Sequence, residues 1–206
     1  PLLVRTREGY RNLCRLLTRA NLRSEKGEGR VKWSELEEFA GGLIALAVHP
    51  STDIGRLTRF FGGDHVVIAL SRHRLREDKT RNRALLELAE RNGLLTIASN
   101  APCYASREGR LLLDAFTALR HHTTLDEAGL LLEANSQRHL KSEREMRALF
   151  ADLPHLVDNT ARVAERLEFT LENLGYEFPV HDVPVGHDQA SFLREMSVAG
   201  ARARYG

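Results

Sequence analysis

Arginines recur at every fourth position of one segment near the start of the chain, a spacing that could create a binding surface. The five residues are Arg7, Arg11, Arg15, Arg19 and Arg23. Side chains four residues apart stand one above another on a helix. Because guanidinium groups form paired hydrogen bonds, the row could bind DNA phosphates or the carboxylates of a neighbouring domain. The alternative is a solvated helix face, which such runs form more often.

No local motif predicts a catalytic residue. His121 and His122 are adjacent, so their side chains point apart on a helix and make a poor chelate. The other histidines are scattered, and none belongs to a zinc motif. No sequence typical of a nucleophile elbow, a phosphate-binding loop or a dinucleotide fingerprint is present. From local motifs alone, therefore, we assign no catalytic residue.

The composition is that of an ordinary soluble protein, since 42% of the 206 residues are hydrophobic and 28% are charged. The formal net charge of +2 is too small to argue for nucleic-acid binding by itself. Two cysteines, Cys14 and Cys103, favour a reducing compartment over a disulfide framework. No apolar run reaches the roughly 18 residues of a membrane span, and the first residues lack the pattern of a secretory signal. We therefore expect a cytoplasmic protein that does not contact a membrane.

Short apolar runs alternate with helical patterns in the first half of the chain. The strands are expected at Leu2–Val4, Leu43–Val48, Val66–Leu70 and Leu94–Ala98, and the helices at Arg7–Leu22, Asp53–Phe61 and Thr80–Asn92. Gly93 is expected to end the last of these helices. Strands and helices that alternate at this spacing predict parallel β/α units with covering helices.

The second half of the chain is expected to be mostly helical. A helix over Arg107–Arg120 would carry Leu112, Phe116 and Leu119 on one side. Two capping boxes, Thr124 with Glu127 and Ser142 with Glu145, predict the starts of two more helices, and Leu156, Thr160, Val163 and Leu167 stripe a further one. The prolines and glycine of Phe178–His187 indicate a linker, and a last helix is expected over Gln189–Arg204.

Three stretches carry a resemblance to a known family. They are RHRLRED at 72–78, TTLDEAGLLLEANSQRHLKS at 123–142, and the segment from Arg138 to Pro179. Together they resemble the polymerase-and-histidinol-phosphatase (PHP) domain of bacterial DNA polymerase III alpha subunits, and most of all the error-prone, translesion branch. The resemblance runs from Leu2 to Tyr205.

The resemblance implies an architecture as well. PHP domains are similar to a distorted seven-stranded β/α barrel, and four strands do not close a barrel. We therefore expect residues 1–178 to be the later part of a PHP domain, with its earlier strands upstream of Pro1. Residues 179–188 would be a linker, and 189–206 the start of the polymerase palm.

The resemblance also identifies positions that correspond to metal ligands in metal-binding relatives. Ala69 and Ala101 stand where such relatives have carboxylates, His73 remains, and Cys103 replaces a histidine. One imidazole and one thiolate fall short of the four ligands of a tight zinc site. We therefore expect a degenerate site, in which His73 is a polar residue at a strand end and Cys103 a small buried hydrophobe.

The family implies a DNA polymerase that extends a primer on a template. It would use two Mg²⁺ ions held by palm aspartates beyond Gly206, so this segment alone is expected to be inactive and to brace the palm. The implied partners are the remainder of the alpha subunit, template-primer DNA, the sliding clamp and translesion accessory proteins. Two alternatives stay open: a metal-dependent PHP phosphoesterase, and a non-catalytic interaction module that docks through the arginine row.

Overall fold

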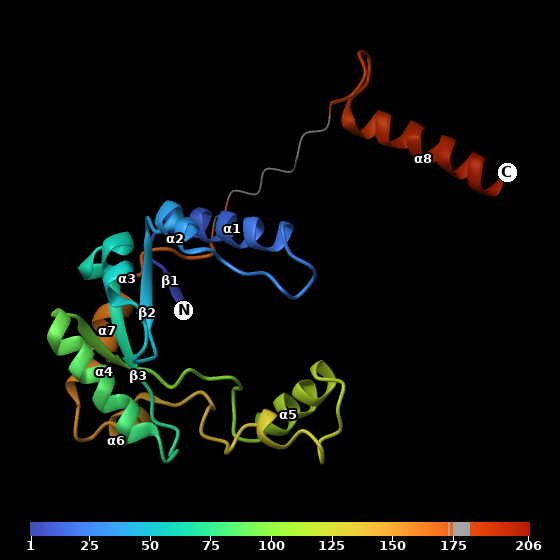
Figure 1. The fold of residues 1–206 in the computed structure, drawn as a ribbon. Coiled ribbons are helices and arrows are strands. Elements are labelled where there is room, and N and C mark those ends of the chain that lie inside the picture. The colour runs from blue at the N-terminus through green and yellow to red at the C-terminus, as the bar shows by residue number, and fades with distance from the viewer. Residues whose placement is uncertain (173, 175–181) are drawn as a thin grey trace. The chain divides into compact units, whose positions relative to one another are not determined.

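A four-stranded sheet with the order β1-β2-β3-β4 forms the centre of the unit Pro1–Phe169 in the computed structural model (Figure 1). The structure describes residues 1–172, 174 and 182–206. The strands are β1 (Leu2–Val4), β2 (Leu43–Ala47), β3 (Val66–Leu70) and β4 (Leu95–Ala98). The predicted mixed α/β class, an open and mostly parallel sheet followed by a helical part, is confirmed.

One strand departs from the prediction of parallel β/α units, because β1 pairs with β2 in the antiparallel direction. Two helices, α1 (Arg7–Leu22) and α2 (Trp33–Phe39), connect these strands. Because Val4 at the end of β1 pairs with Leu43 at the start of β2, the two helices leave and rejoin the sheet at the same end. Single helices, α3 (Ile54–Phe61) and α4 (Asp78–Asn92), connect β2 to β3 and β3 to β4, and both of those pairs are parallel as predicted.

Local capping interactions fix where several helices begin and end. The Thr6 hydroxyl accepts a hydrogen bond from the backbone of Gly9 at the start of α1, and the Asp53 carboxylate caps α3 in the same way. Gly93 ends α4 in the left-handed conformation, with φ of 61°, as predicted. These three helix boundaries are therefore determined by a few neighbouring residues.

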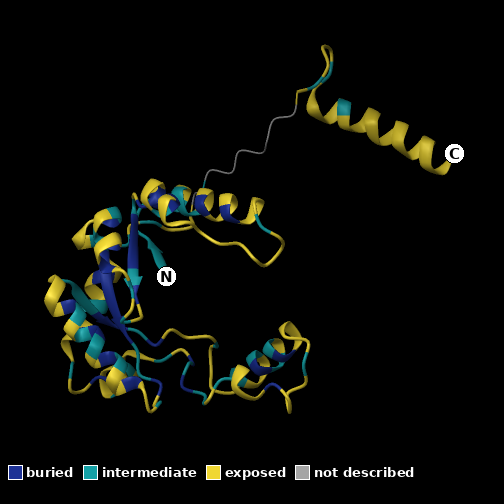
Figure 2. Cartoon of the chain, in the orientation of Figure 1, coloured by how far each residue is buried: buried dark blue, intermediate teal, exposed yellow. Residues whose placement is uncertain are grey.

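The two faces of the sheet bury different apolar clusters, because successive strand residues point to opposite faces. The larger cluster includes Ile68 and Leu70 of β3, packed against α3 and α4. The smaller cluster contains Ile44, Val67 and Ile97. Figure 2 shows β2 and β3 as largely buried. Both faces are thus covered, as the continuous apolar runs predicted.

Two further helices follow in the same unit, α6 (Glu143–Leu149) and α7 (His155–Glu165). The predicted capping box of Ser142 and Glu145 begins α6. Along β4, α7 covers the free edge of the sheet: the Asn159 amide donates to Thr96 O and the Thr160 hydroxyl to Ala98 O, both at 2.9 Å. These side chains satisfy carbonyl groups that an edge strand otherwise leaves unpaired.

The segment around α5 (Gly109–Arg120) differs from the prediction in two respects. First, its predicted apolar side is exposed: Leu112, Phe116 and Leu119 are 59–69% accessible (Figure 2). Second, the helix predicted at Thr124 is a single turn followed by the short 3₁₀ helix η2 (Gly129–Leu131). The Thr124 hydroxyl does accept the expected hydrogen bond, but the positive φ of 49° at Gly129 ends the turn at once.

The unit Thr170–Gly206 contains the helix α8 (Gln189–Tyr205), which confirms the predicted last helix to within one residue. The Asp188 carboxylate accepts a hydrogen bond from the backbone of Ser191 and so begins it. Residues 179–181 of the predicted linker 179–188, and the predicted domain end at 178, lie outside the described residues. Among the helices the structure describes, none is both long and apolar enough to cross a membrane.

Candidate functional site

Two loops at the carboxyl ends of neighbouring strands form the candidate site. One loop follows β3 and carries His73, and the other follows β4 and carries Asn100. The ring Nε2 of His73 lies 2.9 Å from the carbonyl oxygen of Asn100. Because a carbonyl oxygen can only accept, Nε2 donates this hydrogen bond. The buried ring of His73 therefore joins the two loops.

Asn100 also holds a third segment against these loops. Its side-chain Nδ2 donates to the carbonyl oxygen of Gln137 at 3.0 Å and to that of His139 at 2.5 Å. All three residues are at most 7% exposed. The Oδ1 of Asn100 is buried as well and has no hydrogen-bond partner within the described part of the chain. The Asn100 side chain thus connects the loop after β4 to two residues that lie 37 and 39 positions further along the chain.

The same third segment reaches both strand-end loops. The Asn135 side chain donates to the carbonyl oxygen of His73 at 2.8 Å. Tyr104 and His139 form an isolated parallel bridge, in which the backbone of Leu140 donates to Tyr104 at 2.9 Å. Hydrogen bonds therefore join residues 135–140 to both strand-end loops.

The positions expected to correspond to metal ligands do not form a metal centre. Ala69 is buried in the smaller apolar cluster, and His73 is engaged as described. Ala101 is exposed at a positive φ of 40°, and Cys103 is exposed as well, so its predicted burial is wrong. Both residues are exposed because the turn that follows β4 runs along the surface. Within the described residues, no three His, Cys, Asp or Glu side chains come close enough to hold an ion, so the residues present do not fit one.

A second polar cluster surrounds His139, and the spacing of its residues matches no known sequence motif. His139 is buried, with Nδ1 2.9 Å from Ser136 O and Nε2 3.5 Å from a carboxylate oxygen of Glu145. The pKa of Glu145 falls to about 2, because the backbone N–H and the hydroxyl of Ser142 donate to it, and His139 adds a third contact. Burial lowers the pKa of Lys141, whose ammonium donates to Gln137 O at 2.5 Å. His139, Lys141, Ser142 and Glu145 of this cluster lie within the stretch from Arg138 to Pro179 that carries the family resemblance.

The arginine row of α1 is divided by the structure into two parts. Arg19 forms a paired contact with Glu38, with Nη2 3.0 Å from Oε1, and its guanidinium lies 4.6 Å from the centre of the Phe39 ring. Arg23 forms a paired contact with Glu35, with Nη2 2.9 Å from Oε2. The carboxylates that bind this half of the row thus belong to α2.

Electrostatics support this division. The pKa of Glu35 falls to about 2, first because the Arg23 guanidinium donates to it and second because the backbone N–H of Lys32 does so. Arg7 is also engaged. Arg11 and Arg15 are exposed and form no ion pair within the described ranges. Only the middle of the predicted row is therefore available to an external anion.

Comparison with curated proteins finds relatives along the whole chain. Proteins named error-prone DNA polymerase share 38% identity with it in Pseudomonas savastanoi pv. phaseolicola and in Pseudomonas syringae pv. syringae, and 32% in Xanthomonas axonopodis pv. citri. Each alignment covers 99% of this chain but only 19–20% of the relative, so the chain spans about a fifth of the length of the relatives it matches. No family model matches the chain. The predicted resemblance to the error-prone branch is confirmed, and the chain is homologous to one segment of these proteins.

Proposed function

We propose that this chain is a segment of an error-prone DNA-directed DNA polymerase, comprising the later part of its PHP domain and the start of its palm. The observation that carries the proposal is the identity of 32–38% along 99% of the chain with proteins of that name. The open β/α sheet followed by helices agrees with such a placement. The whole enzyme would act in DNA replication and translesion repair in the cytoplasm.

Within the enzyme, the proposed role of this segment is structural. This role is supported by the hydrogen bonds from His73 to Asn100 and from Asn100 to residues 137 and 139, which join the loops where the family resemblance would put a PHP metal centre. A hydrogen-bonded network of this kind orders three loops without supplying a nucleophile or a Lewis acid. The segment would therefore brace the palm and leave the chemistry to residues outside it.

The polymerase reaction would use Mg²⁺, which stabilises the charge that develops on the transferred phosphoryl group. The aspartates that hold it would lie beyond Gly206. Template-primer DNA and the remainder of the polymerase chain are the immediate partners of the proposed enzyme. The sliding clamp and translesion accessory proteins are further partners that the family resemblance suggests.

Primer extension by the complete polymerase and by this chain alone tests the proposal. The complete enzyme should extend a primed template in the presence of Mg²⁺, and the 206-residue chain should not. Asn100→Ala in the complete enzyme should lower its thermal stability but leave the extension rate at 20 °C within about two-fold, because the residue lies outside the reacting groups. A large loss of rate without a loss of stability would contradict the structural role.

Metal content separates the proposal from the phosphoesterase alternative. The chain purified without a chelator should contain far less than one zinc, manganese or iron ion per molecule by mass spectrometry. It should also fail to hydrolyse p-nitrophenyl phosphate in the presence of added Mn²⁺ or Zn²⁺. A stoichiometric metal together with hydrolysis that Asn100→Ala abolishes would overturn the assignment of a degenerate site.

A double substitution tests the remaining alternative, the interaction module. Arg11→Glu and Arg15→Glu together should leave the folded state intact, because both side chains are exposed. If the arginine row docks DNA, this variant of the chain should lose binding to a labelled duplex at low salt. Unchanged binding would remove the row as a docking surface.

A further inference from the structure

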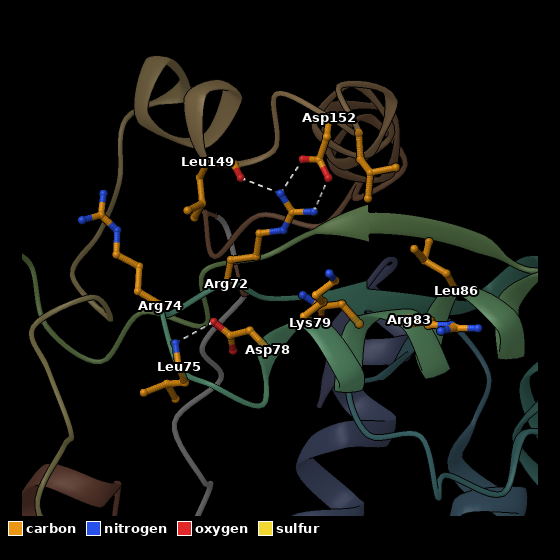
Figure 3. Close-up of a pocket in the computed structure, with 11 residues that line it drawn as sticks. Arg72, Arg74, Leu75, Asp78, Lys79, Arg83, Leu86, Leu149 and Asp152 are labelled. Carbon is orange, nitrogen blue, oxygen red and sulfur yellow. Dashed lines mark hydrogen bonds and ion pairs between the residues drawn. The ribbon is translucent and has the colours of Figure 1, made fainter.

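A pocket with a volume of about 620 Å³ lies between α4 and the turn that joins α6 to α7 (Figure 3). Its volume is within the range of roughly 300–1,000 Å³ typical of ligand sites. Leu86 on one side, and Leu149 and Leu153 on the other, give it apolar walls. These leucines pack against the main core with their inner surfaces, so the walls belong to the rigid part of the unit.

Arg72 forms the floor of this pocket in a fixed orientation. Its guanidinium donates to both carboxylate oxygens of Asp152, at 2.5 and 2.8 Å, and to Leu149 O at 2.8 Å (Figure 3). It also lies 4.6 Å from the centre of the Phe150 ring. The side-chain hydrogen bond from Arg72 lowers the pKa of Asp152, which keeps that carboxylate ionised and committed to Arg72.

The rim of the pocket carries positive charge that the pocket does not neutralise. Four of its lining residues are cationic and two are carboxylates. Asp152 is bound to Arg72, and Asp78 accepts from Arg81 and from the backbone of the preceding loop. Arg74 and Lys79 are exposed and contact no carboxylate among the described residues. Two cations therefore stand beside an apolar hollow without a counter-charge.

We propose that this pocket binds an acidic peptide segment of a separate partner protein. A large apolar side chain of the peptide enters between Leu86 and Leu153, and carboxylates next to it in the peptide pair with Arg74 and Lys79. Cation clusters recognise acidic motifs in this way, and an apolar anchor in a pocket supplies most of the affinity of a small interface. The apolar part of the lining is aliphatic and contains no aromatic ring on which a base could stack, so a peptide fits it better than single-stranded DNA.

Fluorescence anisotropy on the 206-residue chain tests the proposal with a defined probe. The probe is a fluorescein-labelled decapeptide, Gly-Ser-Asp-Glu-Leu-Phe-Asp-Asp-Gly-Ser, and measurable, saturable binding at 50 mM salt is expected. Lys79→Glu should weaken binding about five-fold or more, because it removes one attraction and adds one repulsion. This effect should shrink at 500 mM salt, where exposed charges are screened.

Two controls separate recognition from general charge effects. Arg76→Glu changes the net charge by the same amount, three residues before Lys79 in the chain, but Arg76 lies outside the pocket lining, so this variant should leave binding within about two-fold. A probe with alanine in place of leucine and phenylalanine keeps every charge and should bind at least about ten-fold more weakly, because the apolar anchor is gone. Both variants are expected to fold, since Lys79 and Arg76 are exposed.

Three results would overturn the proposal: no binding of the acidic probe, equal effects of Lys79→Glu and Arg76→Glu, or equal binding of the alanine probe. A labelled oligodeoxythymidine that binds more tightly than the peptide, and loses affinity through Lys79→Glu, would assign the pocket to nucleic acid instead. The inference does not rest on the proposed polymerase function. If the peptide does not bind, the proposed polymerase function is unaffected. Conversely, the chain could bind the peptide even if it were not part of a polymerase.

Discussion

Asn100→Ala offers the most direct test of whether hydrogen bonds hold the strand-end loops together. The substitution removes the two donations to Gln137 O and His139 O. At about 0.5–1.5 kcal/mol for each net hydrogen bond, the loss is about 1–3 kcal/mol. Removal of the unpartnered Oδ1 relieves a buried acceptor and offsets up to about 1 kcal/mol of this loss. We therefore expect the free energy of unfolding to fall by about 1–2 kcal/mol.

Asn100→Asp should be worse than alanine, and this order is the sharper part of the prediction. Aspartate has nearly the same shape, but it replaces the donating Nδ2 with an oxygen that faces two buried carbonyl oxygens. An unpaired buried charge is far less favourable than a small apolar side chain. We expect a further loss of at least about 1 kcal/mol at pH 7. A model in which only side-chain volume matters predicts the opposite order.

Urea unfolding monitored by circular dichroism measures both variants, and thermal unfolding provides a second readout. For a chain of this size, each 1 kcal/mol corresponds to about 2–4 °C in Tm. Asn92→Ala is the matched control, because the exposed Asn92 donates only to Leu88 O of its own helix, at 2.8 Å. It should change stability by less than about 0.5 kcal/mol. Equal effects of Asn100→Ala and Asn92→Ala, or an aspartate variant more stable than the alanine variant, would refute the reasoning.

Three further changes have expected outcomes. Thr160→Val should lower the free energy of unfolding in urea by about 1–2 kcal/mol, because Ala98 O at the edge of β4 loses its donor. The pKa of Glu145 in the folded state is lowered to about 2, so its carboxylate stabilises the fold above its ordinary pKa, and this stabilisation is lost as the pH falls towards 2. Ser142→Ala removes one donor to Glu145 and should therefore flatten the fall in the urea midpoint of unfolding between pH 4.5 and 2. Gly9→Ala should destabilise the chain by at least about 2 kcal/mol by urea unfolding, because the added Cβ would lie 1.9 Å from a backbone oxygen.

Controls for these three changes come from the same chain. Thr117→Val removes a hydroxyl that donates only within its own helix, so the difference from Thr160→Val isolates the bond to β4. Gly63→Ala introduces a Cβ with no atom within 4 Å and should be nearly neutral. For Ser142→Ala, a pH profile parallel to that of the unchanged protein would contradict the assigned cause.

Features set by neighbouring residues could be predicted from the sequence. Gly93 ends α4 and Ser142 begins α6 because each acts on groups within four residues. The apolar runs identified the strands because burial on both faces leaves no alternation. The direction of β1 could not be read in this way, since it depends on which end of the sheet the chain rejoins after α1 and α2.

The candidate site could be predicted only in part for the same reason. The family resemblance singled out His73, but the partners of Asn100 lie 37 and 39 residues away, and no local pattern encodes that pairing. The exposed side of α5 shows a related limit. Helical spacing indicates that Leu112 and Phe116 share a face, but it does not indicate whether anything covers that face.

The side chains that α7 lays along β4 also determine where this sheet can grow. Asn159 and Thr160 already occupy carbonyl groups that an incoming strand would need. A strand contributed by a longer polypeptide or by another molecule would have to displace α7 to join at that border. An additional strand can therefore join the sheet only beside β1, and α7 prevents pairing of β4 with a strand of another molecule.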